Sequence, residues 1–205
     1  MVLNLLELFS GTKSVSKVGV KLGFECISLD LKDADININI LEWDYKTYPP
    51  KYFDVIWSSP PCTEYSKAKT TGIRKIEQAN EIVLKTIEII EYFKPKFYII
   101  ENPQTGLLKQ QSFMNALPFV DVDYCKYGFN YRKRTRLWNN ISNWVPKPLC
   151  DKDCGNIINN KHIATAQRMP SGKKETWGDR PLFKQQELYK IPEELINEIL
   201  NQILQ

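Results

Sequence analysis

Short apolar runs recur along the first half of the chain, and each stops at a turn-forming or polar residue. The runs are VLNLLELFSG (2–11), FECISLDL (24–31), DININI (35–40), YFDVIWSS (52–59) and KFYIIEN (96–102). Their length and their β-branched and aromatic residues predict strands. The stretches 14–24 and 76–93 between them carry apolar residues at helical spacing. Strands alternating with helices predict an α/β fold with a doubly wound, mostly parallel sheet.

Chemically versatile residues follow the expected strands at the points where the strands end. They are Phe9-Ser10-Gly11, Asp30, Pro61-Cys62 and Glu101-Asn102. In open α/β sheets, ligands bind outside the carboxyl ends of the strands. We therefore expect these residues to share one rim of the sheet.

The chain changes character after Pro118. Residues 119–141 predict a β-hairpin with a basic tip, and 142–185 are irregular and rich in Pro, Gly, Lys and Asn. IPEELINEILNQIL, residues 191–204, predicts a closing amphipathic helix that starts after Pro192 and packs on the core.

Composition indicates the cellular environment of the protein and says less about its chemistry. The 205 residues carry a net charge of +4 and an odd number of cysteines, five, which favours reduced thiols over a disulfide framework. We find neither a transmembrane run nor a basic signal-peptide start, and expect a soluble intracellular protein of a prokaryote or of a cell hosting a virus or phage. The basic clusters 131–136 and 171–175 permit a nucleic-acid partner, although a solvated charged face is the more common explanation of such clusters.

The turn after the first run predicts a cofactor site. Gly11 lets backbone approach a ligand, and the following helix would turn N–H groups toward it. One glycine without a GxGxxG or GK[ST] pattern favours a ligand without a pyrophosphate. Asp30, about 20 residues on, is placed to bind ribose hydroxyls. An adenosine-bearing cofactor fits these residues, and so does a plain strand-to-helix turn.

Cys62 and Glu101 are the candidates for chemistry. A thiol at a strand-to-helix turn with lysines nearby can act as a nucleophile, whereas a lone cysteine is more commonly inert and buried. Glu101 ends an otherwise apolar strand, where a carboxylate must be paired or functional. Arg134 and Arg136 alternate along a strand and share one face, with Arg132 ahead of them.

Four motifs together resemble a known family. LELFSG, DVIWSSPPCTEYS, FYIIENP and RKRTRLW occur in the order of the signature motifs of the DNA cytosine-5 methyltransferases. The resemblance covers roughly residues 3–138 and implies a Rossmann-like fold, S-adenosylmethionine as methyl donor and DNA as partner. It divides the chain into a catalytic core (1–138), a short target-recognition-like segment (139–180) and a C-terminal segment (181–205).

The resemblance also implies residue roles. Cys62 would add to C6 of cytosine, Glu101 would act on N3 and the exocyclic amine, Arg136 would hold O2, and Arg134 would brace the active-site loop. The implied cofactor site comprises Phe9, Ser10, Gly11, Asp30, Asn39 and Pro60. The implied substrate contacts are Pro61, Thr63, Tyr65, Ser66, Asn102, Arg132, Arg168 and Lys173.

The chain departs from the family pattern at several points. Thr12-Lys13 stand where further glycine is usual, Asn39 replaces an acidic residue, Pro103 follows the Glu-Asn pair, and Arg132 replaces a glutamine. We expect weaker cofactor binding from Asn39, and no loss of it. These departures keep open a catalytically silent nucleic-acid-binding module.

The segment after the arginine strand is short for sequence recognition, so RNA, single-stranded DNA or a free cytosine nucleotide remain alternative substrates. The segment contains Cys150, Cys154 and the chain's single histidine, His162, and Cys125 could join them. Both a structural zinc site and unrelated reduced cysteines fit this pattern. The oligomeric state cannot be read from the sequence, and a monomer is the expectation.

Overall fold

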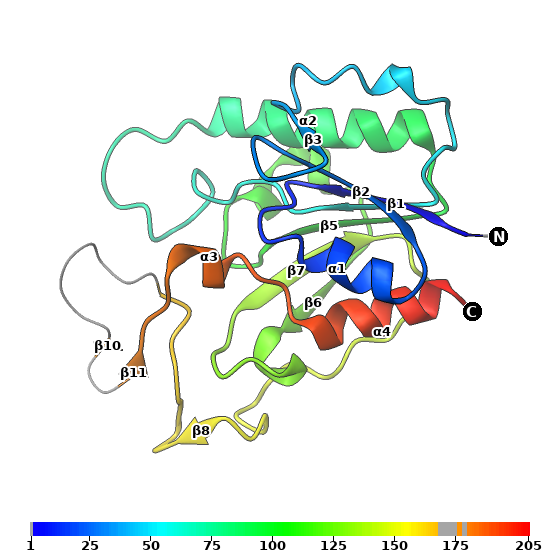
Figure 1. Cartoon of the computed structure of the whole chain (residues 1–205). Helices are drawn as coiled ribbons and strands as arrows, with labels where there is room; N and C mark the ends of the chain where they lie inside the picture. The colour runs from blue at the N-terminus through cyan, green and yellow to red at the C-terminus, as the bar shows by residue number, and fades with distance from the viewer. Residues whose placement is uncertain (1, 168–175, 178–179) are drawn as a thin grey trace.

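A mixed seven-stranded sheet forms the centre of the molecule (Figure 1). The computed structural model describes residues 2–167, 176–177 and 180–205. The strand order is β3-β2-β1-β4-β5-β7-β6. The strands are β1 (Asn4–Leu8), β2 (Glu25–Asp30), β3 (Ile36–Asn37), β4 (Val55–Ser58), β5 (Phe97–Pro103), β6 (Phe119–Asp123) and β7 (Arg134–Asn139). The first five pair in parallel and β7 runs antiparallel to both its neighbours, which confirms the predicted mostly parallel sheet.

Helices cover both faces of this sheet (Figure 1). Helices α1 (Ser14–Lys21) and α4 (Glu193–Ile203) lie together on one face, and α2 (Ile76–Phe93) lies on the other. Alternation along β4 sends Trp57 into the core under α4 and Ile56 into the core under α2. The two hydrophobic layers therefore hold the sheet rigid, with the strand ends free to carry chemistry.

Helix α2 spans the predicted residues 76–93. Lys94 then adopts a left-handed conformation (φ 45°), and its backbone N–H donates to the Ile90 carbonyl. Pro95 follows, which cannot continue a helix.

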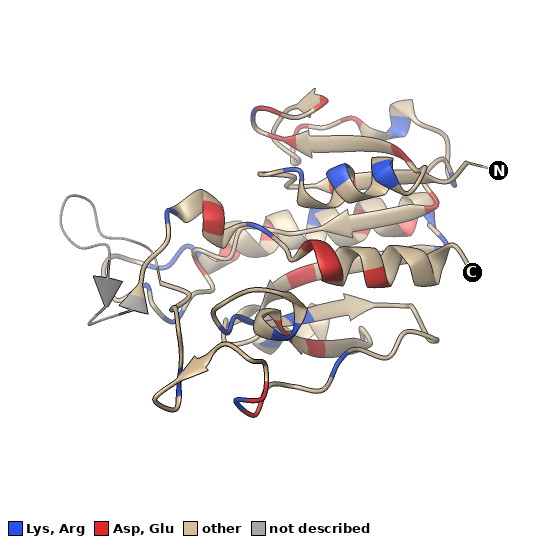
Figure 2. Cartoon of the chain, turned by 60° about the horizontal axis from the view of Figure 1, so that its bottom comes forward, with Lys and Arg blue, Asp and Glu red and all other residues tan. Residues whose placement is uncertain are grey.

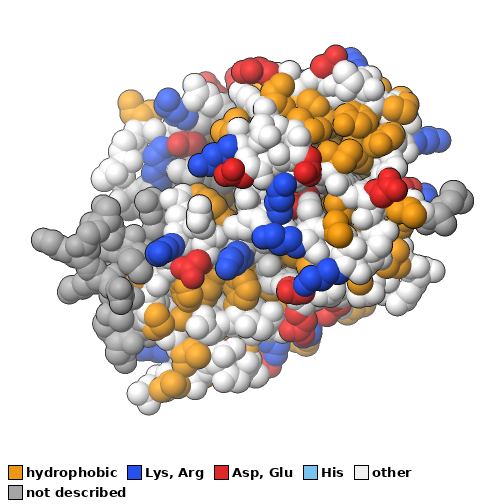
Figure 3. Space-filling view, viewed as in Figure 1, with side chains coloured by type: hydrophobic (Ala, Val, Ile, Leu, Met, Phe, Trp, Pro, Cys, Tyr) orange, Lys and Arg blue, Asp and Glu red, His pale blue; other side chains and the backbone are white. Residues whose placement is uncertain are grey.

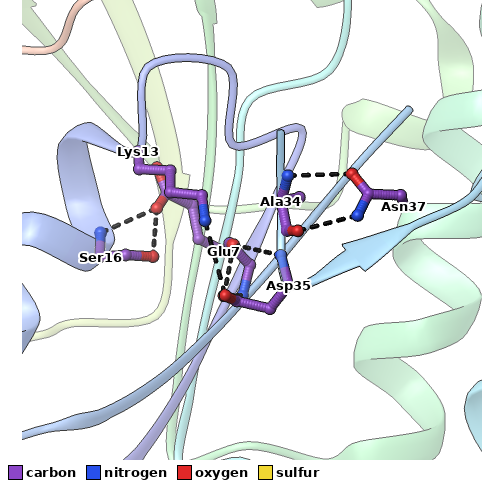
Figure 4. Close-up of polar contacts among 7 residues, drawn as sticks. Glu7, Lys13, Ser16, Ala34, Asp35 and Asn37 are labelled. Atoms are coloured by element: carbon purple, nitrogen blue, oxygen red, sulfur yellow. Dashed lines mark hydrogen bonds and ion pairs between the residues drawn. The ribbon is translucent and has the colours of Figure 1, made fainter. Parts of the chain in front are cut away.

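Strand β3 is shorter than the predicted run 35–40. The Asn37 side chain accepts a hydrogen bond from the Ala34 N–H (3.0 Å) and donates one to the Ala34 carbonyl (2.9 Å), as Figure 4 shows. Such local side-chain bonds compete with strand pairing. The alternating Ile and Asn residues therefore form a shorter strand than their pattern predicts.

The remaining elements are short and connect the sheet to the C-terminus. They are η1 (Tyr45–Thr47), η2 (Leu108–Gln110), η3 (Ser112–Met114), η4 (Tyr124–Tyr127), β8 (Ile157–Ile158), β9 (Lys161–His162), β10 (Thr176–Trp177), β11 (Arg180–Pro181) and α3 (Gln185–Leu188). The described residues include no helix with the length and apolar character to cross a membrane.

Candidate active site

A cavity of about 960 Å³ opens at the carboxyl ends of the parallel strands. Its lining includes most of the residues that the sequence analysis proposed for cofactor and base. They are Phe9, Ser10, Gly11, Asp30, Asn39, Pro60, Pro61, Cys62, Thr63, Glu101 and Asn102. The expectation that these strand ends share one rim is confirmed.

The first wall of the cavity is the turn between β1 and α1. The buried Glu7 carboxylate accepts hydrogen bonds from the backbone N–H groups of Val15 (3.1 Å) and Ser16 (2.8 Å) and from the Ser16 hydroxyl. Figure 4 shows Glu7 and Ser16 joined in this way beside Lys13. Burial raises the pKa of Glu7, and the Ser16 hydrogen bonds oppose that shift. The sequence predicts that these N–H groups face a ligand. They instead donate to Glu7, which lies on β1 and caps the N-terminus of α1.

The second wall is the end of β2. The Asp30 carboxylate accepts hydrogen bonds from the backbone N–H groups of Gly11 (2.8 Å) and Leu31 (2.7 Å). Gly11 has a φ of 47°, a conformation that suits glycine, and it brings backbone to the carboxylate. The neighbouring Ser10 hydroxyl is buried and lacks a hydrogen-bond partner among the described residues. A buried donor without a partner is costly, so a polar ligand at this wall would satisfy it.

Cys62 lies in the loop after β4 and is partly buried. The Asn102 side-chain amide donates to the Pro60 carbonyl (2.9 Å), which fixes this loop to the end of β5. Burial raises the pKa of the Cys62 thiol, the Lys133 ammonium lowers it, and the Glu101 carboxylate raises it. The Cys62 thiol therefore lies near one ammonium group, that of Lys133, and one carboxylate, that of Glu101.

Glu101 is held from two sides. The Tyr124 hydroxyl donates to its carboxylate (2.9 Å), and Lys133 Nζ lies 3.8 Å from the same oxygen. Lys133 also lies 4.9 Å above the Tyr124 ring and donates to the Leu188 carbonyl (3.1 Å). Lys133 lines the cavity and was not proposed from the sequence. Its place just ahead of the alternating arginines was the signal that could have identified it.

Arg134 and Arg136 share one face, as predicted, but they do not line the cavity. The β5–β7 register sets Leu137 opposite Glu101, so the arginines project from the other face of the sheet. Arg136 binds Asp121 through two hydrogen bonds (2.7 and 3.0 Å), and Arg134 binds Asp123 in the same way (3.0 and 2.7 Å). Arg136, expected to hold the base, and Arg134, expected to brace the active-site loop, are instead both engaged with carboxylates of β6 in this structure.

Three other proposed substrate contacts, Tyr65, Ser66 and Arg132, do not line the cavity. Tyr65 is fully buried against α2, and its hydroxyl donates to Asn80 (2.8 Å), so it does not face the cavity as predicted. Ser66 accepts a hydrogen bond from the Ala68 N–H (3.2 Å) within its own loop, and Arg132 is exposed ahead of β7. The predicted contacts Arg168 and Lys173 lie outside the described residues.

Arg74 organises the loop that follows Cys62. Its guanidinium donates to the carbonyls of Glu64 (2.8 Å), Ser66 (2.7 Å) and Lys69 (2.7 Å). Three carbonyls held by one planar group give the loop a single conformation. The sequence carries no pattern that distinguishes this arginine from a surface one.

Lysines surround the mouth of the cavity. The lysines among its lining residues are Lys13, Lys17, Lys32, Lys133 and Lys190. Figure 3 shows basic side chains gathered over the middle of this face, and Figure 2 shows acidic residues interleaved with basic ones elsewhere. The same lining includes the carboxylates of Glu7, Asp30, Asp33, Glu101 and Glu187, so the cavity presents charges of both signs.

A parallel sheet flanked by helices, with an acidic residue at the end of β2 and a cavity at the strand ends, defines a Rossmann-like fold of the methyltransferase type. A solved structure described as a "putative DNA modification methyltransferase encoded within prophage" from E. coli shares this fold, with a TM-score of 0.53 at 15% identity. The match covers 72% of this chain and 52% of that chain. The chain thus spans about half the length of that protein.

Sequence comparison gives the family. The profile of the C-5 cytosine-specific DNA methylases matches residues 4–118. A "Probable DNA (cytosine-5)-methyltransferase" of Frog virus 3 (isolate Goorha) is 37% identical, covering 97% of this chain and 99% of the relative. The chain belongs to the C-5 cytosine-specific DNA methylase family, and its enzyme class is DNA (cytosine-5)-methyltransferase. The viral relative is matched over almost its whole length.

Proposed function

We propose that the chain transfers a methyl group from S-adenosylmethionine to C5 of cytosine in DNA through a covalent bond between Cys62 and C6. One observation carries the proposal. Cys62 lies in the loop after β4 and Glu101 lies near the end of the adjacent strand β5, and both line the cavity whose other wall is the turn around Gly11. Thiol, carboxylate and cofactor-type turn therefore open into one space.

The first and second walls fit S-adenosylmethionine. When bound, this cofactor supplies an electrophilic methyl group. The Asp30 carboxylate has acceptor positions beyond the two N–H groups it binds, which suits ribose hydroxyls. The Ser10 hydroxyl is available for a polar group of the ligand. Asn39 lines the same cavity and offers an amide to the adenine.

The remaining wall fits the cytosine ring. The Cys62 thiolate forms a bond to C6, and the ring electrons move toward N3, where Glu101 donates a proton or hydrogen bond. C5 thereby becomes enamine-like and takes the methyl group. Loss of the C5 proton to a base and cleavage of the bond from Cys62 to C6 then release 5-methylcytosine. The proton on N3 returns to Glu101 in the same step.

Lys133 supplies the cation that the arginines do not. Its ammonium lowers the pKa of the Cys62 thiol and lies beside Glu101. It thus favours the thiolate and stabilises negative charge that develops on the ring. We assign to Lys133 the electrostatic role expected of Arg136.

Access to DNA follows from the mouth of the cavity. Pro61 and Thr63 are exposed on its rim, and the surrounding lysines suit backbone phosphates. A cytosine in a duplex must leave the base stack to reach Cys62. The basic residues Arg168 and Lys173 remain predicted phosphate contacts.

The test compares the parent protein with Cys62→Ala. We expect the parent to incorporate labelled methyl from S-adenosylmethionine into duplex DNA and to form a stable adduct with 5-fluorocytosine DNA. Cys62→Ala should lose roughly 10³-fold or more of the transfer rate and form no adduct. Calorimetry with S-adenosylmethionine should give the same affinity for both proteins. Equal methyl transfer by the two proteins would refute the covalent mechanism.

A parallel assay identifies the substrate. The short region after β7 favours testing duplex DNA beside single-stranded DNA, RNA and dCMP. We expect duplex DNA to rank first, and dCMP or RNA in first place would overturn DNA as the substrate. Absence of S-adenosylmethionine binding by the parent protein would instead support a silent nucleic-acid-binding module.

A further inference from the structure

Three cysteines and the chain's single histidine meet at one point outside the cavity. We refer to them as the Cys/His cluster, made of Cys125, Cys150, Cys154 and His162. Their ligand atoms all lie within 4.8 Å of one another, and Cys150 Sγ lies 3.6 Å from His162 Nε2. In a tetrahedral zinc site with Zn–S bonds of about 2.3 Å, neighbouring ligand atoms lie about 3.5 to 3.8 Å apart. We propose that the Cys/His cluster holds one structural zinc ion that fastens the region after β7 to the end of β6.

The ligands come from three separate short elements. Cys125 lies in η4, directly after β6. Cys150 and Cys154 flank a tight turn in which Lys152 has a φ of 65°. His162 lies on β9, whose hairpin with β8 turns through two asparagines in left-handed conformations. Thiolate and imidazole are the ligands that zinc prefers. Their convergence from three separate elements favours a metal site over a chance group of surface cysteines.

The region that carries these ligands has little apolar core of its own. Between Trp144 and Ala164, a stretch described throughout, Cys150 is the single buried residue. Side-chain burial therefore cannot account for the order of this stretch. Zinc binding can, because the free energy of coordination becomes folding free energy in such small units.

Hydrogen bonds tie the same stretch to the β6–β7 hairpin at both ends. The Cys150 N–H donates to the buried Asp123 carboxylate (3.0 Å), and the Ala164 N–H donates to the Asn130 carbonyl (3.2 Å). Three thiolates and one zinc ion carry a net negative charge, and Lys126 stands next to Cys125. Lys126 places one positive charge beside the cluster, and its ammonium group is paired with Asp153 (2.7 Å).

The site would connect recognition to catalysis. Cys125 directly follows Tyr124, whose hydroxyl holds Glu101 (2.9 Å). Asp123, which precedes Tyr124, binds both Cys150 and Arg134. A zinc ion on Cys125 would therefore fix the backbone that positions the active-site carboxylate.

Metal analysis of the full-length protein, purified under reducing conditions, tests the proposal. We expect about one zinc ion per chain in the parent, and less than about a tenth of that in Cys154→Ala and in His162→Ala. His162→Cys retains a tetrahedral ligand set and should keep its zinc. Cys26→Ala, a cysteine outside the cluster, should keep the parent's zinc content. Cobalt in place of zinc should give the visible absorption of a tetrahedral thiolate site.

Hydrogen exchange provides a second readout that does not depend on a folded variant. Removal of the metal from the parent should expose the amides of Cys150 and Ala164 to exchange and leave the amides of β1 and β4 protected. A parent protein without stoichiometric metal would overturn the proposal, as would a disulfide among the cluster cysteines. Another metal in its place would overturn the assignment to zinc.

Discussion

Lys133 and Cys62 illustrate how single side chains set the chemistry of the cavity. Burial disfavours the charged thiolate and raises the pKa of Cys62, and the Lys133 ammonium opposes that shift. The thiolate is the nucleophile, so its supply depends on pH. Because the pKa of Cys62 is raised, methyl transfer should rise with pH through neutrality and still be rising at about 8.5, the ordinary pKa of a cysteine thiol.

Lys133→Gln tests this electrostatic link. Loss of the positive charge should raise the pKa of Cys62 further, lower the rate at neutral pH roughly tenfold and move the pH–rate profile to higher pH. Lys133→Arg should retain the parent profile because the charge remains. Lys96→Gln, which removes an exposed lysine paired with Asp54 at the amino ends of β4 and β5, serves as the control. An unmoved profile in Lys133→Gln would contradict the role of Lys133.

The sequence predicts which residues lie at the strand ends, but it does not predict which side chains they contact. Cys62 and Glu101 follow apolar runs, which places them at the rim of a parallel sheet whatever the register. Tyr65 looks like a loop residue near the substrate, but its ring completes the core against α2. Only the packing of distant elements decides whether such a ring turns inward.

At the scale of elements, the Arg74 side chain makes three of the contacts that shape the loop from Thr63 to Arg74. Arg74→Ala should release the three carbonyls that its guanidinium binds and leave the loop mobile. Adduct formation at Cys62 should slow by roughly tenfold, while S-adenosylmethionine affinity stays the same.

Trypsin provides the structural measurement for Arg74→Ala. Cleavage after Lys67 and Lys69 should be faster than in the parent. Thr71→Ala, an exposed change in the same loop, should keep the parent's cleavage and adduct rates. Equal rates in Arg74→Ala and the parent would show that other contacts hold the loop.

Periodicity predicted α2 and the sharing of a face by Arg134 and Arg136. It could not predict which face of β7 meets the cavity, because that depends on pairing with β5 and β6. The same limit hid Lys133, which lies one residue ahead of Arg134. The bidentate pairs with Asp121 and Asp123 became visible only once β6 stood beside β7.

At the scale of the whole molecule, α4 packs the C-terminal residues against α1, near the N-terminus. Its apolar stripe packs against α1 in one hydrophobic cluster, with Leu195, Ile199 and Leu200 fully buried. The predicted boundaries at 138/139 and 180/181 stay predictions, but the packing of the closing helix on the core agrees with the sequence pattern.

Leu200→Ala should lower the free energy of unfolding by about 2 to 5 kcal/mol, because it leaves a cavity between α4 and the sheet. Leu204→Ala is the matched control, since Leu204 is 47% exposed at the end of the same helix. Chemical denaturation monitored by circular dichroism measures both. A comparable loss in the two variants would show that α4 does not belong to the core.

The antiparallel direction of β7 has a consequence for how this enzyme could diversify. The parallel strands bring residues at or just after their carboxyl ends to the cavity, whereas β7 brings the residue before its first. If Lys133 were deleted, the β7 ladder could stay in place and Arg132 would move up into the vacated position. One lost codon would thus exchange an ammonium for a guanidinium beside Glu101. The length of the turn before β7, as much as its residue types, therefore decides which cationic side chain lies beside Glu101.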